Sequence, residues 1–90
     1  LALQTAHARV TALEEAVTAS EARRDAARLG HEVGDRTTLD LLNAENDLDA
    51  ARLALLQART EVLQNRLKLQ ALAGRLDEER LAAVDAALQR

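Results

Sequence analysis

Apolar residues recur along this chain at the alternating three- and four-residue spacing of helices that pack against other helices. In residues 1–29, one apolar stripe consists of Leu3, Ala6, Val10, Leu13 and Val17. A second stripe lies on another face of the same predicted helix and consists of Ala12, Ala16, Ala19, Ala22, Ala26, Leu29 and Val33. A helix with two apolar stripes is expected to contact two neighbours, one on each flank.

The second half of the chain repeats every seven residues. The large members of this repeat are Leu41, Leu48, Leu55, Val62, Leu69 and Leu76, and between them lie Ala44, Ala51, Ala58, Asn65 and Leu72. Five heptads of this kind predict a coiled-coil helix, with Asn65 as the polar residue that sets its register. A flanking stripe again predicts a second neighbour; it consists of Leu39, Leu42, Leu53, Leu56, Leu63 and Leu67.

Residues 30–38 separate the two helical patterns. Gly30 and Gly34 both allow a positive φ, which a helix stop followed by a tight turn commonly needs. Thr37 with Asp40 three residues later has the form of a capping box, with Asp in place of the usual Glu. The sequence therefore predicts an antiparallel helical hairpin over residues 1–74 with its tip at residues 30–38.

A third, shorter element is predicted after this hairpin. Gly74 is expected to end the second helix as a C-cap, and Asp77 to cap a new helix whose apolar face is Leu81, Val84 and Leu88. The predicted fold class is thus all-α: a long antiparallel coiled-coil hairpin at residues 1–74 plus a short third helix at residues 75–90.

The composition indicates a part that needs neighbours. The chain has 90 residues, of which 48% are hydrophobic and none is aromatic, so its core is small. The net charge of −3 is unevenly placed, with most of it in residues 30–43, and there is no clustered cationic face, which argues against nucleic-acid binding. There is no apolar run of about 18 residues, so this fragment is not expected to insert into a membrane.

Candidate chemistry is sparse. The sequence has no Cys, no Ser/His/Asp or Cys/His set, no glycine-rich phosphate loop and no pair of His residues at ligand spacing. We therefore predict that the chain is not an enzyme and that it has neither a cofactor nor a metal site of its own.

One segment carries a specific resemblance. Residues 33–45 read Val-Gly-Asp-Arg-Thr-Thr-Leu-Asp-Leu-Leu-Asn-Ala-Glu. They resemble the hairpin tip of the TolC-like outer-membrane efflux family, whose pattern is roughly V-G-x-R-T-x-x-D-V-L-(N/D)-A. Residues 67–76 resemble the same family's helix end, L-x-x-A-x-G-x-L. The resemblance extends over nearly the whole chain.

The resemblance implies an architecture and partners. In that family three protomers form an α-helical tunnel through the periplasm, continuous with a β-barrel in the outer membrane. This chain would be one hairpin of the trimeric α-barrel, with residues 75–90 entering the equatorial belt. Its partners would be two further copies of itself, a periplasmic adaptor protein and, through the adaptor, an inner-membrane transporter. It would lie in the periplasmic portion of a bacterial outer-membrane protein.

The resemblance also implies roles for residues at the tip. Val33, Gly34 and Asp35 would dock against the adaptor. The entrance constriction and its latch would involve His31, Arg36, Asp40 and Asn43. Three-fold symmetry turns one Asp40 per chain into a ring of three carboxylates that attracts cations. Asn43 departs from the acidic form of the pattern, and His31 stands where the family often has Tyr.

Plainer explanations exist for several of these residues. Gly34 can be only a turn glycine, Asp40 only a helix cap, and Arg36 only a solvated turn residue. Two other functions also remain open: the hairpin of a periplasmic adaptor, and a general coiled-coil scaffold. An adaptor would carry a different Arg/Leu/Ser tip and flanking lipoyl-like strands. In a scaffold, changes at Gly34 and Arg36 would affect only folding.

Overall fold

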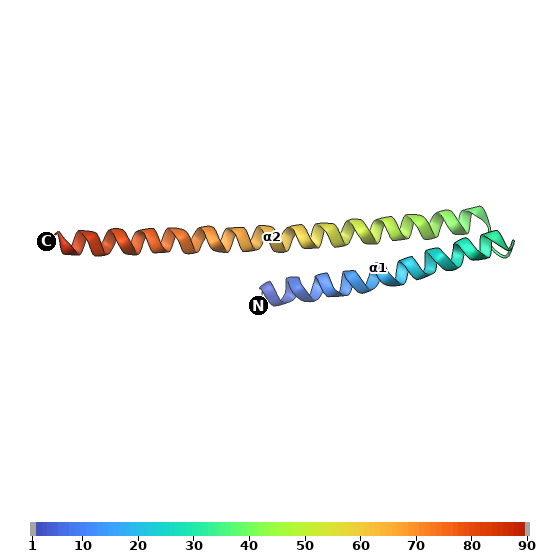
Figure 1. Cartoon of the computed structure of the whole chain (residues 1–90), viewed down its shortest axis with the longest axis horizontal. Helices are drawn as coiled ribbons and strands as arrows, with labels where there is room; N and C mark the ends of the chain where they lie inside the picture. The colour runs from blue at the N-terminus through green and yellow to red at the C-terminus, as the bar shows by residue number, and fades with distance from the viewer. Residues whose placement is uncertain (1, 90) are drawn as a thin grey trace.

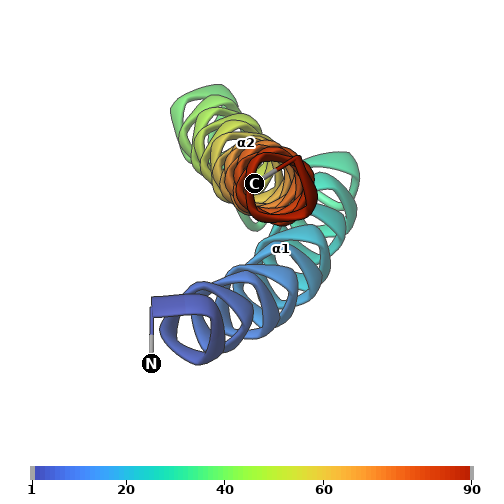
Figure 2. The same cartoon turned by 90° about the vertical axis from the view of Figure 1, so that its left-hand side faces the viewer.

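Two long antiparallel helices form the hairpin that the sequence predicts (Figure 1). The computed structural model describes residues 2–89 of the chain, and the side chains of residues 4–89. Helix α1 runs over Ala2–Glu32 and helix α2 over Thr38–Leu88, and the molecule measures 85 × 18 × 12 Å. At 1.5 Å per residue α2 is about 76 Å long. It extends far beyond the start of α1, and the two helices wind around each other (Figure 2).

The predicted break at Gly74 is wrong, because α2 continues through it to Leu88. Among the described glycines only Gly34 has a positive φ, so Gly74 lacks the left-handed conformation of a C-cap. A glycine inside a helix costs only about 1 kcal/mol relative to alanine, and its neighbours here are strong helix formers. Residues 75–88 are therefore the end of α2 and not a separate third helix; Arg90 lies outside the described residues.

The turn ends α1 with a Schellman motif built on Gly34. Gly34 has φ +82°, its N–H donates to the carbonyl of His31 at 3.2 Å, and the N–H of Asp35 donates to the carbonyl of Gly30 at 2.7 Å. These are the two backbone hydrogen bonds that define the motif. The expectation of a positive φ is confirmed at Gly34 and is wrong at Gly30, which lies within α1. The tip is consequently shorter than predicted, with α1 continuing to Glu32.

The start of α2 is closed by the predicted capping box. The hydroxyl of Thr37 accepts from the Asp40 N–H at 3.1 Å, and the Thr37 N–H donates to Asp40 Oδ2 at 3.2 Å. Two backbone donors at the helix end are thereby satisfied.

Thr37→Ala should lower the free energy of unfolding by about 1 kcal/mol, because alanine offers no acceptor for the Asp40 N–H. Urea unfolding followed by circular dichroism measures this loss. Thr37→Ser keeps the hydroxyl and should restore most of it; an equal loss in both variants would count against the cap.

The core is a narrow seam of alternating large and small residues. Buried side chains come from both helices: Ser20, Ala27, Leu48, Leu55 and Ala58. The first predicted stripe of α1 faces α2, since Ala6, Val10, Leu13 and Val17 are half-buried; the side chain of Leu3 lies outside those described. The second stripe stays uncovered, as do the flanking leucines of α2: Leu29 is 62% exposed and Leu56 61%.

Ion pairs run along both edges of the seam. On the first edge, residues spaced by seven on each helix form three exposed pairs: Glu14 with Arg59, Glu21 with Arg52, and Arg28 with Glu45, with N–O distances of 3.7, 3.9 and 3.7 Å. On the second edge, Arg9 pairs with Glu61 at 2.9 Å. Side chains that are about half exposed contribute little individually, so these pairs favour one register more than they add stability.

The last part of α2 has no partner helix in this chain. Each described residue from Leu63 to Gln89 is exposed, including Leu69, Leu72 and Leu76 of the heptad repeat. Over residues 2–89, neither helix contains a stretch apolar and long enough to cross a membrane.

Candidate functional site

The residues expected to dock an adaptor lie at the outermost point of the hairpin. Val33, Gly34 and Asp35 form the turn between the helices, and all three are exposed. The side chain of Val33 is 63% exposed although it is apolar. The turn thus presents an apolar side chain beside a carboxylate, held by the Schellman hydrogen bonds; the docking role stays a prediction.

His31 joins the two helices at the tip. Its Nε2 lies 3.1 Å from the hydroxyl of Thr38, the first residue of α2. This contact is within one chain, and His31 does not line the groove that holds the other predicted latch residues.

Arg36 folds back over the end of α1. A Cβ atom at Gly30 would lie 2.8 Å from Arg36 Cγ and 3.1 Å from Arg36 Cδ. The absence of a side chain at Gly30 therefore leaves room for the Arg36 side chain. Gly30 does not supply the positive φ of the turn. The position also suits a cation, since the C-terminal end of a helix is electronegative.

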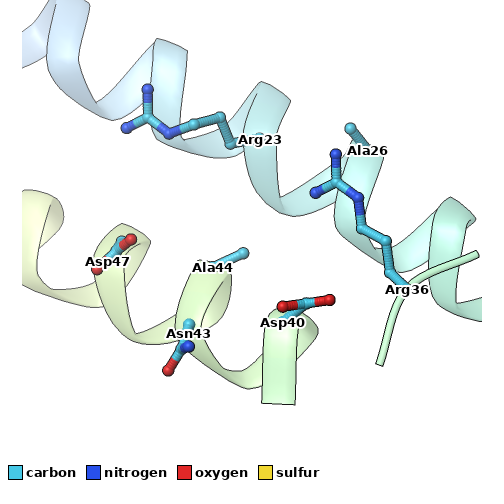
Figure 3. Close-up of a pocket in the computed structure, with 7 residues that line it drawn as sticks. All are labelled: Arg23, Ala26, Arg36, Asp40, Asn43, Ala44 and Asp47. Atoms are coloured by element: carbon cyan, nitrogen blue, oxygen red, sulfur yellow. The ribbon is translucent and has the colours of Figure 1, made fainter. Parts of the chain in front are cut away.

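An open groove next to the tip gathers the remaining predicted residues (Figure 3). Its volume is about 430 Å³, and it is lined by Arg23, Ala26, Arg36, Asp40, Asn43, Ala44 and Asp47. The two arginines lie on the side of α1 and the turn, while Asp40, Asn43 and Asp47 project from α2 (Figure 3). The groove therefore has one cationic wall and one largely acidic wall.

Asp40 and Asn43 both line this groove, and their role at an entrance stays a prediction. One oxygen of Asp40 accepts from the Thr37 N–H, which leaves its second oxygen available to other groups. Over residues 2–89, no three His, Asp or Glu side chains are grouped so that they could hold a metal ion. The groove thus offers charged and hydrogen-bonding groups.

Two residues of the groove, Arg23 and Asp47, were not singled out from the sequence. Arg23 donates to the buried Ser20 hydroxyl at 2.8 Å, and among the described residues Asp47 has no cation within 4 Å. The available signal was the heptad itself. Arg23 follows Arg9 by fourteen residues, and Asp47 precedes Glu61 by fourteen, so both share the second edge of the seam.

Comparisons with known proteins identify relatives over most of this chain. Residues 1–75 match the family described as outer membrane efflux protein. The outer membrane efflux protein BepC of Brucella suis biovar 1 (strain 1330) is 38% identical over 79 residues, which are 88% of this chain and 17% of BepC. The outer membrane protein TolC of Escherichia coli (strain K12) is 35% identical over 81 residues, 90% of this chain and 16% of TolC.

A further relative, the outer membrane protein TolC of Salmonella enteritidis, is 34% identical over 79 residues, 88% of this chain and 16% of the relative. The chain thus spans about a sixth of the length of these proteins. No solved structure matches it significantly. Because the family match covers most of the hairpin, including the whole tip, the chain belongs to the outer membrane efflux protein family.

Proposed function

We propose that this hairpin is a wall segment of an outer-membrane efflux channel and contributes the tip at the periplasmic entrance. The observation that carries the proposal is that the family's tip segment forms the turn of a hairpin whose two helices each keep an uncovered apolar stripe. Such stripes favour side-by-side packing of further helices, as in the wall of a tube. Three copies of the parent protein would complete that tube.

The mechanism we propose is passive. The paired helices shift relative to their neighbours when a periplasmic adaptor engages the exposed turn at Val33, Gly34 and Asp35, and the entrance widens. Energy comes from an inner-membrane transporter and not from this chain. Residues 75–88, although continuous with α2, would lie in the belt around the tunnel, and the hairpin itself in the periplasm.

The groove supports an electrostatic role for the entrance. Asp40 keeps one carboxylate oxygen free of the cap, and in a three-fold assembly three such groups form a ring that attracts cations. Arg36 lies on the opposite wall of the same groove, where its guanidinium fork could hold a neighbouring hairpin closed.

Conductance of the full-length parent protein in planar bilayers tests this function. Asp40→Asn is the appropriate variant, because asparagine can still accept from the Thr37 N–H and so preserves the cap while removing the charge. We expect a cation-selective conductance in the wild type and a several-fold loss of selectivity in the variant. Asp49→Asn, which removes a charge outside the groove, is the matched control and should behave as wild type.

Failure has two distinct forms. If the channel has the same selectivity in Asp40→Asn and in the wild type, the tunnel proposal stands, but Asp40 does not line the tunnel. A parent protein that forms no channel would favour the coiled-coil scaffold, in which Asp40 serves only as the cap of α2.

A further inference from the structure

The second edge of the seam contains two pairs of oppositely charged residues. One of them forms an ion pair and the other does not. Arg9 and Glu61 are 2.9 Å apart. In an antiparallel pair, moving along one helix requires an equal and opposite move along the other. Fourteen residues on from Arg9 is Arg23, and fourteen residues back from Glu61 is Asp47. The register set by Arg9 and Glu61 therefore brings Arg23 opposite Asp47.

In the structure, Arg23 and Asp47 do not form an ion pair. Arg23 and Asp47 line opposite walls of the same groove, but they form no ion pair within 4 Å (Figure 3). The Arg23 Nη2 instead donates to the Ser20 hydroxyl, one turn back in its own helix, at 2.8 Å. The Arg23 guanidinium thus has one acceptor in its own helix, and Asp47 offers a second on the opposite wall of the groove.

We propose that Arg23 is a two-position clasp that sets the width of the hairpin next to its tip. In the open position, seen here, Arg23 is held by Ser20. In the closed position it pairs with Asp47, draws α2 toward α1 and narrows the groove.

The energetic difference between the two positions is small. Ser20 is only 4% exposed, but its hydroxyl can bond a carbonyl of the preceding turn when Arg23 leaves, as Thr11, Thr18 and Thr60 do in this chain. Asp47 is exposed, so an ion pair there gains little free energy. A clasp between two positions of similar free energy is easily biased by a neighbouring molecule.

The first edge provides the hinge for such a motion. Its ion pair nearest the tip, Arg28 with Glu45, is formed at 3.7 Å, while the second edge at the same level is open. Next to the tip, the helices are thus linked on the first edge and not on the second, which favours rotation about the first edge over separation of the whole hairpin. The proposal concerns the hairpin itself and does not depend on the channel function.

Electron–electron distance measurements between two spin labels test the clasp, and the absence of native cysteine allows clean labelling. Labels at Ala22→Cys and Asn46→Cys, exposed positions that adjoin the groove residues Arg23 and Asp47 in the sequence, report the separation of the two helices at the level of the groove. Labels at Glu15→Cys and Gln57→Cys, farther from the tip and also exposed, are the control pair. Each pair is measured in the 90-residue chain with Ser20→Ala, with Asp47→Asn and without further change.

We expect two distances for the first label pair. Ser20→Ala removes the competing acceptor and should raise the ratio of short to long distances by about 2- to 12-fold, the net contribution of one hydrogen bond. Asp47→Asn should lower this ratio by about 1.4- to 5-fold, the contribution of an exposed ion pair, and 1 M salt, which screens the pair, should lower it as well. The control pair should not change.

Two results would overturn the proposal. One is a single distance that is identical in all three chains. The other is a shift in the same direction for Ser20→Ala and Asp47→Asn, which would indicate a general loosening of the hairpin and no competition between two acceptors for Arg23.

Discussion

We expect Gly34→Ala to destabilise the hairpin and Gly74→Ala to stabilise it. At Gly34 the backbone has φ +82°, a left-handed conformation that costs an L-residue about 1–2 kcal/mol. A Cβ atom there would meet nothing within 4 Å, so the whole loss comes from the backbone conformation. At Gly74 the backbone is helical and the added Cβ is equally free of contacts, so alanine should add about 1 kcal/mol.

Chemical unfolding of the two variants, followed by circular dichroism of the helices, measures both the loss and the gain in the free energy of unfolding. The pair is well matched because the chemical change is identical and only the local conformation differs. A loss of stability in Gly74→Ala would mean that α2 bends or ends there in solution, as the sequence pattern first suggested. A neutral result at Gly34 would contradict the Schellman turn.

Leu48→Ala has the largest effect expected of any single truncation in the chain. Leu48 is 2% exposed and lies at the centre of the seam, so its loss removes buried apolar area and leaves a cavity. Such substitutions cost about 2–5 kcal/mol, a large part of the stability of a small domain. The variant should therefore unfold at a much lower urea concentration than the wild type.

Leu53→Ala is the matched control for Leu48→Ala. Leu53 is 55% exposed on the flank of α2, so in the isolated chain its truncation should change stability by less than about 0.5 kcal/mol. In the channel proposed above the same residue would be covered by a neighbouring helix, and its truncation should then weaken the assembly. Equal effects of the two substitutions in the isolated chain would show that the seam is not where the structure has it.

The sequence predicted the hairpin because its signals are local and agree with one another. The heptad of α2, the Thr37 capping box and the glycine turn each depend on residues a few positions apart. The end of α2 was predicted wrongly because glycine occurs both at helix C-caps and inside helices. Its presence at Gly74 does not reveal whether the backbone takes a positive φ, and strong helix formers on both sides carry the helix through.

The groove was only partly foreseeable. Arg36, Asp40 and Asn43 could be named because they fall within the tip segment that resembles the family. Arg23 and Asp47 are 24 residues apart, and their proximity depends on the register between the helices. That register follows from pairs such as Arg9 with Glu61, which only the three-dimensional structure establishes. The choice of Ser20 as the partner of Arg23 depends on side-chain conformation, which no spacing rule predicts.

The ion pairs of the first edge have a consequence for misalignment. A seam that repeats every seven residues looks almost the same after one helix slides by a heptad. The pattern of charges does change after such a slide. Along the edge, α1 presents Glu14, Glu21 and Arg28, and α2 presents their partners Arg59, Arg52 and Glu45. A slide in one direction would bring Glu21 against Glu45, and a slide in the other would bring Arg28 against Arg52. The single reversed sign on the first edge therefore disfavours both one-heptad slides and favours the observed alignment of α1 with α2.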